Sequence, residues 1–345
     1  MPRRILLLLI LIGIGTVVVL LRKALLKDSR PMQSTTQDVP PEASQAQTSI
    51  SSAYTIDERH PQEFTAIRSP KRSPRTADLI ALASPEAIHV DGYADEAVWA
   101  KAAVVNTLDR SSQRSIQLRA VYTQTHLYIL ATYPDKSENR THRSYVYHEA
   151  EGIYRPANDR EDVFVLKWSM DESRAHLDLS LLTPHRADIW YWKAFRTDPQ
   201  GYADDKIQTL SMTAIENSRI INKGDTGPLY LLRVGDAGRS SYKESIPFEY
   251  AGNALPRYTS RPPQGSRADV RAKGVWIEET WTLEFGRALD TTHDDDVIFS
   301  TDKTYLFGVS CYEVAGGKVE PDWHQPLYKT GDIFDRITLR FAERE

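Results

Sequence analysis

Aromatic rings and charges are concentrated in one short stretch, residues 187–206, which reads ADIWYWKAFRTDPQGYADDK. Within it, Trp190, Trp192 and Tyr202 lie close in sequence to Lys193. Rings beside charges occur in protein cores, in sugar-binding platforms and in the walls of cofactor pockets. The residue types leave these three interpretations open, and other residues of the chain narrow them.

Few side chains in this sequence are suited to ligate a metal. Met170 ends the predicted strand VFVLKWSM, His185 precedes the aromatic stretch, and His324 lies in the predicted loop EPDWHQPLYKTG. A haem iron takes one or two such ligands inside an apolar, aromatic slot. A buried Met nevertheless often fills a core, and a loop His is ordinarily exposed. Lys193 would have to lose its proton to bind iron, so we expect it to pair with an acid or an aromatic ring.

Two acidic runs, Asp204–Asp205 and Asp294–Asp296, offer clustered oxygen atoms. Ca²⁺ binds clustered oxygens, so a calcium site is one interpretation of either run. Adjacent acids in turns more commonly face solvent, or hold a loop through bonds from side chain to backbone. We expect that structural role for both runs.

Several classes of activity find no support in the sequence. The 345 residues carry a net charge of −4, so no overall positive field attracts nucleic acid. The one cysteine, Cys311, rules out an intrachain disulfide and a Cys-x-x-Cys pair, and its apolar neighbours predict a buried strand residue. The nucleophile elbow, the His-Glu-x-x-His motif and the phosphate loop are missing. The sequence therefore favours a binding or electron-transfer subunit over a catalyst.

The first residues are typical of a membrane anchor. After the basic start MPRR, the run from Ile5 to Leu21 carries no charge. As a helix this run spans roughly 25 Å, close to the thickness of a bilayer core. We predict an uncleaved single-pass helix over residues 1–27, with a cleaved signal peptide as the alternative. The short basic end would stay in the cytoplasm, which places the rest of the protein outside the inner membrane, in the periplasm of a Gram-negative cell.

The remainder divides into a tether and a β-rich domain. Residues 28–76 are rich in Ser, Thr, Gln and Pro, offer little to bury, and are predicted to be a disordered linker. Residues 77–345 contain alternating, β-branched and aromatic segments, with room only for short helices such as DEAVWAKA after Gly92. This pattern predicts one all-β domain, an antiparallel β-sandwich. The Gly-, Pro- and Ser-rich segment 235–267 is long for a loop and is expected to be functional or to wrap a ligand.

Four stretches occur in a recognisable order. They are EAIHVDGYADEAVWAKA, ADIWYWKAFRTDPQGYADDK, the segment from GDAGRSSY to GRALDTTHDDDV, and YLFGVSCYEVAGGKVEPDWHQPLYKTG. The first resembles the opening strand and Trp-containing turn of family-9 carbohydrate-binding modules. The other three, which cover most of residues 161–341, resemble the haem-binding domain of ethylbenzene dehydrogenase gamma subunits and of the cytochrome c-552 / dimethyl sulfoxide reductase-like group.

That resemblance implies a β-sandwich that holds haem and exchanges electrons with a partner oxidoreductase or the quinone pool. Met, His or Lys side chains are axial ligands of the iron in that family. Met170 and His324 are therefore the implied ligands, with Lys193 and Lys318 in reserve. The residues implied to line or buttress the slot are Trp190, Trp192 and Tyr202.

The chain departs from the family at one chemically decisive place. Many relatives carry a Cys-x-x-Cys-His haem attachment motif where this sequence reads DESRAHLDLSLLTPHR. Thioether bonds need Cys, so a covalent haem is excluded and a non-covalent b-type haem remains. The alternatives are a haem-free sandwich that binds carbohydrate or another small ligand, with exposed Trp rings as a stacking platform, and a structural subunit of a periplasmic complex.

Overall fold

The computed structural model describes residues 75–109, 114–171, 177, 183–222, 227–247, 250–312 and 335–344. These residues all belong to one unit of the chain, Ala66–Glu345. The predicted anchor, nearly all of the predicted linker, and the residues Lys318 and His324 lie outside the described ranges. In the parts of the chain that are described, no helix is both long and apolar enough to cross a membrane.

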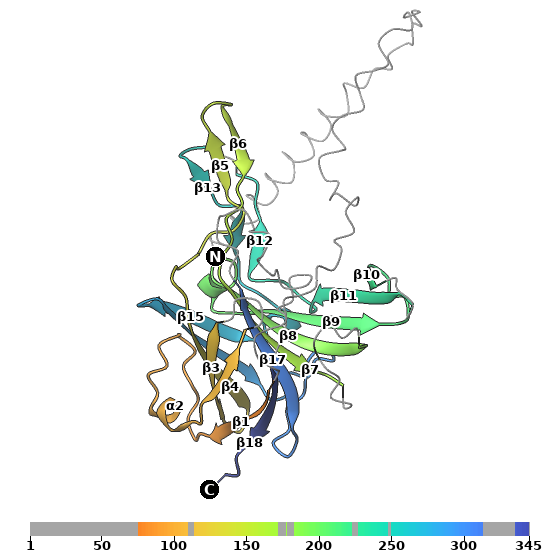
Figure 1. Cartoon of the computed structure of the whole chain (residues 1–345). Helices are drawn as coiled ribbons and strands as arrows, with labels where there is room; N and C mark the ends of the chain where they lie inside the picture. The colour runs from red at the N-terminus through yellow and green to blue at the C-terminus, as the bar shows by residue number, and fades with distance from the viewer. Residues whose placement is uncertain are drawn as a thin grey trace, which may run out of the picture. The chain divides into compact units, whose positions relative to one another are not determined.

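The regular secondary structure of the described residues is almost entirely β, as the alternating and β-branched sequence predicts (Figure 1). The main sheet contains β1 (Thr76–Ala83), β2 (Val105–Leu108), β3 (Ser115–Tyr122), β4 (His126–Pro134), β7 (Val163–Ser169), β8 (His185–Lys193), β9 (Asp204–Ser211), β10 (Arg219–Asn222), β11 (Leu229–Gly235), β15 (Arg271–Ile277), β16 (Thr280–Ala288), β17 (Tyr305–Tyr312) and β18 (Arg336–Phe341). The shorter elements are α2 (Ala97–Lys101), η2 (Asp198–Gln200), η3 (Ser266–Ala268), β5 (Tyr145–His148), β6 (Ile153–Pro156), β12 (Tyr242–Glu244), β13 (Ala254–Leu255) and β14 (Tyr258–Ser260).

The main sheet runs in the order β10-β11-β9-β8-β7-β17-β18-β1-β3-β4-β16-β15, with β2 paired to β3. Neighbouring strands are antiparallel, as predicted, except at β1. This strand lies between β18 and β3 and is parallel to both. The first strand of the domain therefore joins the two halves of the sheet.

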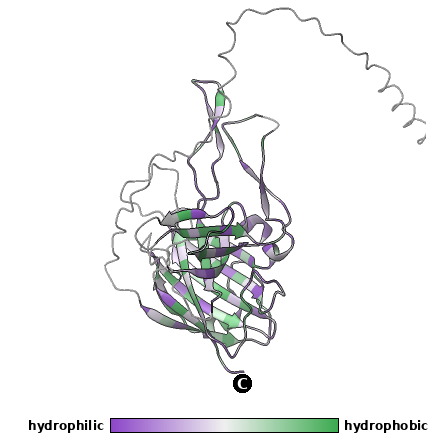
Figure 2. Ribbon diagram, turned by 90° about the vertical axis from the view of Figure 1, so that its right-hand side faces the viewer, coloured by the Kyte–Doolittle hydropathy of each residue, from purple (hydrophilic) through white to green (hydrophobic). Residues whose placement is uncertain are grey.

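The two halves pack face to face and enclose one core, which makes the fold a β-sandwich. Aromatic rings meet across the interior: Tyr133 of β4 lies 5.5 Å from Phe164 of β7, and Trp192 of β8 lies 5.0 Å from Trp281 of β16. In Figure 2 the apolar residues gather on the strands of this sheet. Cys311 is fully buried in β17, which confirms the expectation for this residue.

The turn between β8 and β9 also meets β15, the last strand of the sheet. Tyr202 forms an isolated bridge with Arg271 of β15, and the N–H of Ala203 donates to the carbonyl of Val270 over 3.0 Å. The N–H of Ala272 donates in turn to the carbonyl of Gly201 over 3.1 Å. The turn that follows β8 is thereby fixed against the opposite half of the sandwich.

Two local predictions have different outcomes. The short helix expected after Gly92 is α2, and its Trp99 donates through Nε1 to the buried carboxylate of Glu284 over 2.9 Å. Segment 235–267 was expected to be a long loop, but its described part forms β12, β13 and β14. Strand β13 pairs with β5 and β12 pairs with β14, which gives the backbone groups of this segment partners.

Candidate functional site

The aromatic stretch of the sequence surrounds a buried ion pair between Lys193 and Asp204. Lys193 ends β8 and is only 2% exposed, and its Nζ lies 2.5 Å from Oδ2 of Asp204. The same ammonium donates to the hydroxyl of Tyr242 over 3.0 Å and lies 4.7 Å from the ring centres of Tyr191 and Tyr242. The prediction that Lys193 pairs with an acid or with an aromatic ring is confirmed in both respects.

Asp204 is the centre of a group of cations. Lys206 Nζ lies 3.0 Å and Arg267 Nη2 lies 2.7 Å from its carboxylate oxygens, in addition to Lys193. Burial opposes the charged carboxylate, but these three charges outweigh it and hold the pKa of Asp204 below its usual range. Burial, opposed by Asp204, lowers the pKa of Lys193 to about 8. The expectation that Asp204 and Asp205 face solvent in a turn is wrong, because both lie buried at the start of β9.

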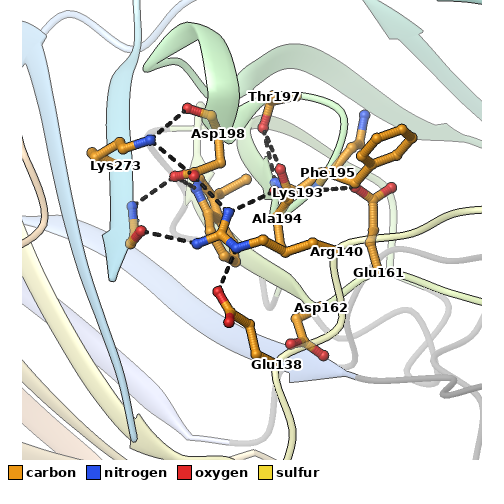
Figure 3. A network of polar contacts seen from close by, with 12 residues as sticks. Glu138, Arg140, Glu161, Asp162, Lys193, Ala194, Phe195, Thr197, Asp198 and Lys273 are labelled. Carbon is orange, nitrogen blue, oxygen red and sulfur yellow. Dashed lines mark hydrogen bonds and ion pairs between the residues drawn. The ribbon is translucent and has the colours of Figure 1, made fainter. Parts of the chain in front are cut away.

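The turn after β8 is held by the buried carboxylate of Asp198 (Figure 3). It accepts the indole N–H of Trp192 over 3.0 Å and the backbone N–H of Gly274 over 2.7 Å. Two cations, Arg140 Nη1 at 2.8 Å and Lys273 Nζ at 3.1 Å, complete its partners. The turn thus fixes both the orientation of Trp192 and the position of Lys193 at the strand end.

A second polar cluster lies where β8 and β9 approach the segment after β16. Asp188, Asp205 and Asp296 each offer a carboxylate oxygen, and the three oxygens lie within 4.8 Å of one another. Arg287 is fully buried beside them, with Nη1 2.5 Å from Asp188 Oδ2 and 3.4 Å from Asp296 Oδ1. The two acidic runs of the sequence therefore each contribute one residue to a shared site, which their separate positions in the chain did not predict.

The sequence matches the family model described as ethylbenzene dehydrogenase over residues 96–325, about two thirds of the chain. The chain belongs to the ethylbenzene dehydrogenase family. The matched residues include all of β7, β8 and β9, which carry the ion pair and most of the acidic cluster. No curated protein sequence matches this family member.

Solved structures similar to this ethylbenzene dehydrogenase family protein include two described as carbohydrate-binding. A family-9 carbohydrate-binding module from Caldicellulosiruptor kristjanssonii with cellotriose is 11% identical, with a TM-score of 0.34, over 78% of this chain and 95% of that chain. A putative carbohydrate-binding protein from Bacteroides uniformis is 8% identical, with a TM-score of 0.35, over 78% and 100% of the two chains.

In this family member the two tryptophans predicted to line a slot are core residues. Trp190 and Trp192 are both fully buried. Trp190 lies 5.1 Å from Trp168, and Trp192 meets the edge of Trp281. Neither ring is available to stack on a sugar in this arrangement. Tyr202 instead lies at the junction of the sheet ends, with the guanidinium of Arg271 4.2 Å from its ring centre.

Met170 and the reserve ligand Lys193 lie at opposite ends of the β7–β8 strand pair. Lys193 pairs with Val163, whereas Ser169, the residue before Met170, pairs with Ala187 six residues along the strand. At about 3.3 Å per residue these ends are roughly 20 Å apart. Met170 is half-buried and packs against the core at the end of the strand pair opposite Lys193. Its N–H donates to the carbonyl of Arg186. Met170 and Lys193 therefore do not meet around one iron in this structure.

His185 lies at the Met170 end of the same strands. Its Nδ1 lies 2.8 Å from the carbonyl oxygen of Thr183, and its Nε2 lies 3.0 Å from the side-chain nitrogen of Gln208. The ring is buried at the start of β8. It shares this end of the strand pair with Met170 and not with Lys193.

One residue that the sequence analysis did not single out, His142, lies close enough to the ion pair to feel the charge of Lys193. Its Nδ1 is 3.4 Å from Glu161 Oε1, and its ring centre is 5.7 Å from that of Tyr258. Burial, followed by the charges of Arg196, Arg160, Lys193 and Arg143, lowers the pKa of His142 to about 2. This histidine is therefore neutral at physiological pH and sits in a positive field. A lone His in the segment THRSY carries no pattern that would have revealed this position.

Proposed function

We propose that this chain is a non-catalytic, membrane-anchored subunit of an ethylbenzene dehydrogenase-type oxidoreductase, working outside the cytoplasm and holding a b-type haem for electron transfer. The observation that carries the proposal is the family match over residues 96–325. The uncharged run Ile5–Leu21 supports the anchor, and the single cysteine supports non-covalent attachment. A redox partner protein is part of the proposal, because a subunit that only carries electrons must receive them and pass them on.

At the Lys193 end of β8 the described residues offer a haem iron one donor, Lys193 itself. Lys193 is buried and its pKa is lowered to about 8, so losing the proton costs less than it does for an exposed lysine. Asp204 competes for the same Nζ and would have to release it, keeping Lys206 and Arg267 as partners. The described surroundings offer Lys193 as a ligand and the nearby cations as partners for the propionates. A bound haem would supply one-electron transfer at that place.

Of the predicted ligands that the structure describes, only Lys193 lies at this end of β8. Met170 and His185 lie at the opposite end of β8, so they are not partners of Lys193 on one iron in this arrangement. His324 lies outside the described residues and stays a prediction. β17, the strand before it, ends at Tyr312 opposite Val163, which is the Lys193 end of the sheet.

The test is a reduced-minus-oxidised absorption spectrum of the full-length protein, purified in detergent after expression with haem. We expect a sharp alpha band that is lost or shifted in Lys193→Met and unchanged in Lys303→Met, where the lysine is exposed. Loss of the band in Met170→Leu but not in Lys193→Met would contradict the assignment. A folded protein that develops no Soret band when titrated with haem would refute haem binding.

A haem-free module for an anionic small ligand is the second candidate, favoured by the charges around His142. Arg143, Arg160 and Arg196 all lower its pKa, so a carboxylate or phosphate ligand would meet a positive field there. Calorimetric titration with glucuronate would test this candidate, with glucose as the uncharged control. Binding of glucuronate that weakens in Arg160→Gln, together with no haem spectrum, would favour this function over electron transfer.

A further inference from the structure

Four buried aspartates from four parts of the fold form one cluster, in which oxygens of Asp188, Asp205 and Asp296 lie within 4.8 Å of one another. Asp188 lies in β8, Asp205 in β9, Asp236 directly after β11, and Asp296 in the segment between β16 and β17. Asp188 and Asp205 are fully buried, and Asp236 and Asp296 are each 5% exposed. The backbone N–H of Asp236 donates to the carbonyl of Asp205 over 3.2 Å, which fixes the segment after β11 against β9.

One guanidinium is the only described cation that contacts this cluster. Arg287 binds Asp188 and Asp296 through Nη1 and the carbonyl of Val297 through Nη2. The neighbouring groups are already engaged: Asp295 accepts from Ser266 and from the N–H of Ala237. Ionised, the four carboxylates and Arg287 would carry a net charge of −3 in a water-poor interior. Such a charge is unfavourable without protons or a cation.

Several oxygens of the cluster are left without hydrogen-bond partners. They are Oδ1 of Asp188, Oδ2 of Asp205 and both carboxylate oxygens of Asp236. Buried polar atoms of this kind are rare and call for a bound group or a proton. The other atoms have clear partners: Asp188 Oδ2 accepts from Arg287 and from the N–H of Val297, and Asp296 Oδ2 accepts from Thr291. The oxygens of Asp188 and Asp205 that lack a donor are therefore available to a cation or to a shared proton.

We propose that Asp188, Asp205 and Asp296 bind one calcium ion, with Asp236 beside Asp205. Ca²⁺ binds oxygen ligands at about 2.3–2.6 Å, so two ligand oxygens on one ion are at most about 5 Å apart. The 4.8 Å within which oxygens of Asp188, Asp205 and Asp296 gather meets this limit. The donors are all oxygens, which suits a hard cation and not Zn²⁺ or copper. Irregular sites of this kind suit Ca²⁺ better than Mg²⁺, which demands near-octahedral geometry.

Arg287 acts as a positioning residue in this site. Its Nη1 holds the carboxylates of both Asp188 and Asp296 while leaving Asp188 Oδ1 without a donor. A calcium ion would connect β8 and β9 to the segment after β16. Because Asp205 follows Asp204 in the chain, the ion would also help to fix the position of Asp204.

Protons compete with the ion for the same oxygens. Burial, then the charge of Asp188, raises the pKa of Asp236 to about 8 and that of Asp296 to about 7, and it raises the pKa of Asp205 as well. The charged groups facing the cluster also include Arg287, Asp295 and the His293–Asp269 pair. Calcium binding should therefore release protons and should be tighter at pH 8 than at pH 6.

The experiment uses the full-length protein in detergent, without added haem, after treatment with a chelator. Isothermal titration with CaCl₂ and MgCl₂ at pH 8 and pH 6 is combined with thermal unfolding. We expect one calcium per chain, an unfolding midpoint that rises with calcium concentration, and proton release seen as a buffer-dependent enthalpy. Asp296→Asn should weaken binding at least tenfold. Asp302→Asn, at an exposed acid outside the cluster, is the matched control and should bind as the wild type does.

Asp205→Asn provides a second variant, and Asp296→Asn keeps the test informative if the substitution at the fully buried Asp205 prevents folding. Absence of calcium binding, with Asp296→Asn raising the stability at pH 8, would show that protons alone neutralise the cluster. Binding that is unchanged in Asp296→Asn would place the ion elsewhere. Equal affinity for magnesium would overturn the assignment to calcium. Each of these outcomes is independent of whether the protein carries haem.

Discussion

Lys193 and Asp204 form a buried ion pair in which Nζ and Oδ2 are 2.5 Å apart. The two partners are not equivalent. Asp204 has two further cations, Lys206 and Arg267, within 3.0 Å, whereas the described contacts give Lys193 this one carboxylate. Removing the charge of Asp204 leaves three cations without their carboxylate, whereas removing Lys193 leaves Asp204 with two cations. The two variants should therefore differ in their free energy of unfolding.

We expect Asp204→Asn to destabilise the protein more than Lys193→Met does. The first leaves three cations around an uncharged amide, and breaking a buried pair in this way costs about 3–5 kcal/mol. The second leaves Asp204 with Lys206 and Arg267, so its cost should be clearly smaller. Urea unfolding of both variants, with Lys206→Met as a partly exposed control, gives the comparison. Equal losses for the two main variants would mean that Lys206 and Arg267 do not compensate Asp204.

Trp190 and Trp192 should differ when each is replaced by Phe. The indole N–H of Trp192 donates to Asp198 over 3.0 Å, whereas that of Trp190 is buried without a hydrogen-bond partner. Both substitutions leave a similar cavity, but only Trp192→Phe also removes a bond to a charged acceptor, worth about 1.5–3 kcal/mol. Denaturant unfolding should therefore rank Trp192→Phe as the more destabilised variant, and the opposite order would contradict the contacts described.

His142 should make the protein sensitive to acid. Its pKa is about 2 in the folded protein and near 6.5 when unfolded, so the unfolded chain binds the extra proton. Stability is therefore lost as the pH falls below 6.5 towards 2, at up to about 1.4 kcal/mol per pH unit. His142→Phe should remove that part of the loss between pH 6.5 and 4.5. Unfolding curves at both pH values check it, with His148→Phe, at an exposed position, expected to behave as the wild type does.

Gly92 should not tolerate a side chain. Its φ of +89° is one that L-residues rarely adopt, and an added Cβ would lie 2.9 Å from Cγ2 of Val275. We expect Gly92→Ala to cost about 2–3 kcal/mol through strain and overlap. Gly252, with a φ of +78° and no atoms near the added Cβ, separates the two effects. Gly252→Ala should cost only the smaller strain, and an equal loss at both sites would show that overlap at Gly92 is unimportant.

Structural features that depend on residues close together in the sequence were predicted correctly. The strand patterns, the helix containing Trp99 and the burial of Cys311 agree with expectation. The orientation of Trp190 and Trp192 did not follow, because both faces of β8 are buried. Tyr191 and Ile189 pack into a second apolar cluster on the other side of that strand. Without polar residues on one face, periodicity gives no sign of which ring points inward.

The relationships between distant segments are what the sequence could not supply. Asp205 and Asp296 each appeared as part of a solvated acidic run, since adjacent acids usually are. Only the folding of the main sheet upon itself brings them together with Asp188 and Asp236. The same applies to the separation of Met170 from Lys193. The two lie close in the chain but at opposite ends of a strand pair.

Strand β1 has its parallel partner at the other end of the domain: Thr76 pairs with Arg336 and Ala81 with Phe341. During synthesis the first strand is made about 260 residues before the strand that completes its hydrogen bonds. Until then β1 has one open edge in the middle of the sheet, and open edges invite pairing with other chains. Contacts between such distant segments also form slowly. This edge therefore stays open until β18 has been made, and a chain that stops before β18 should aggregate.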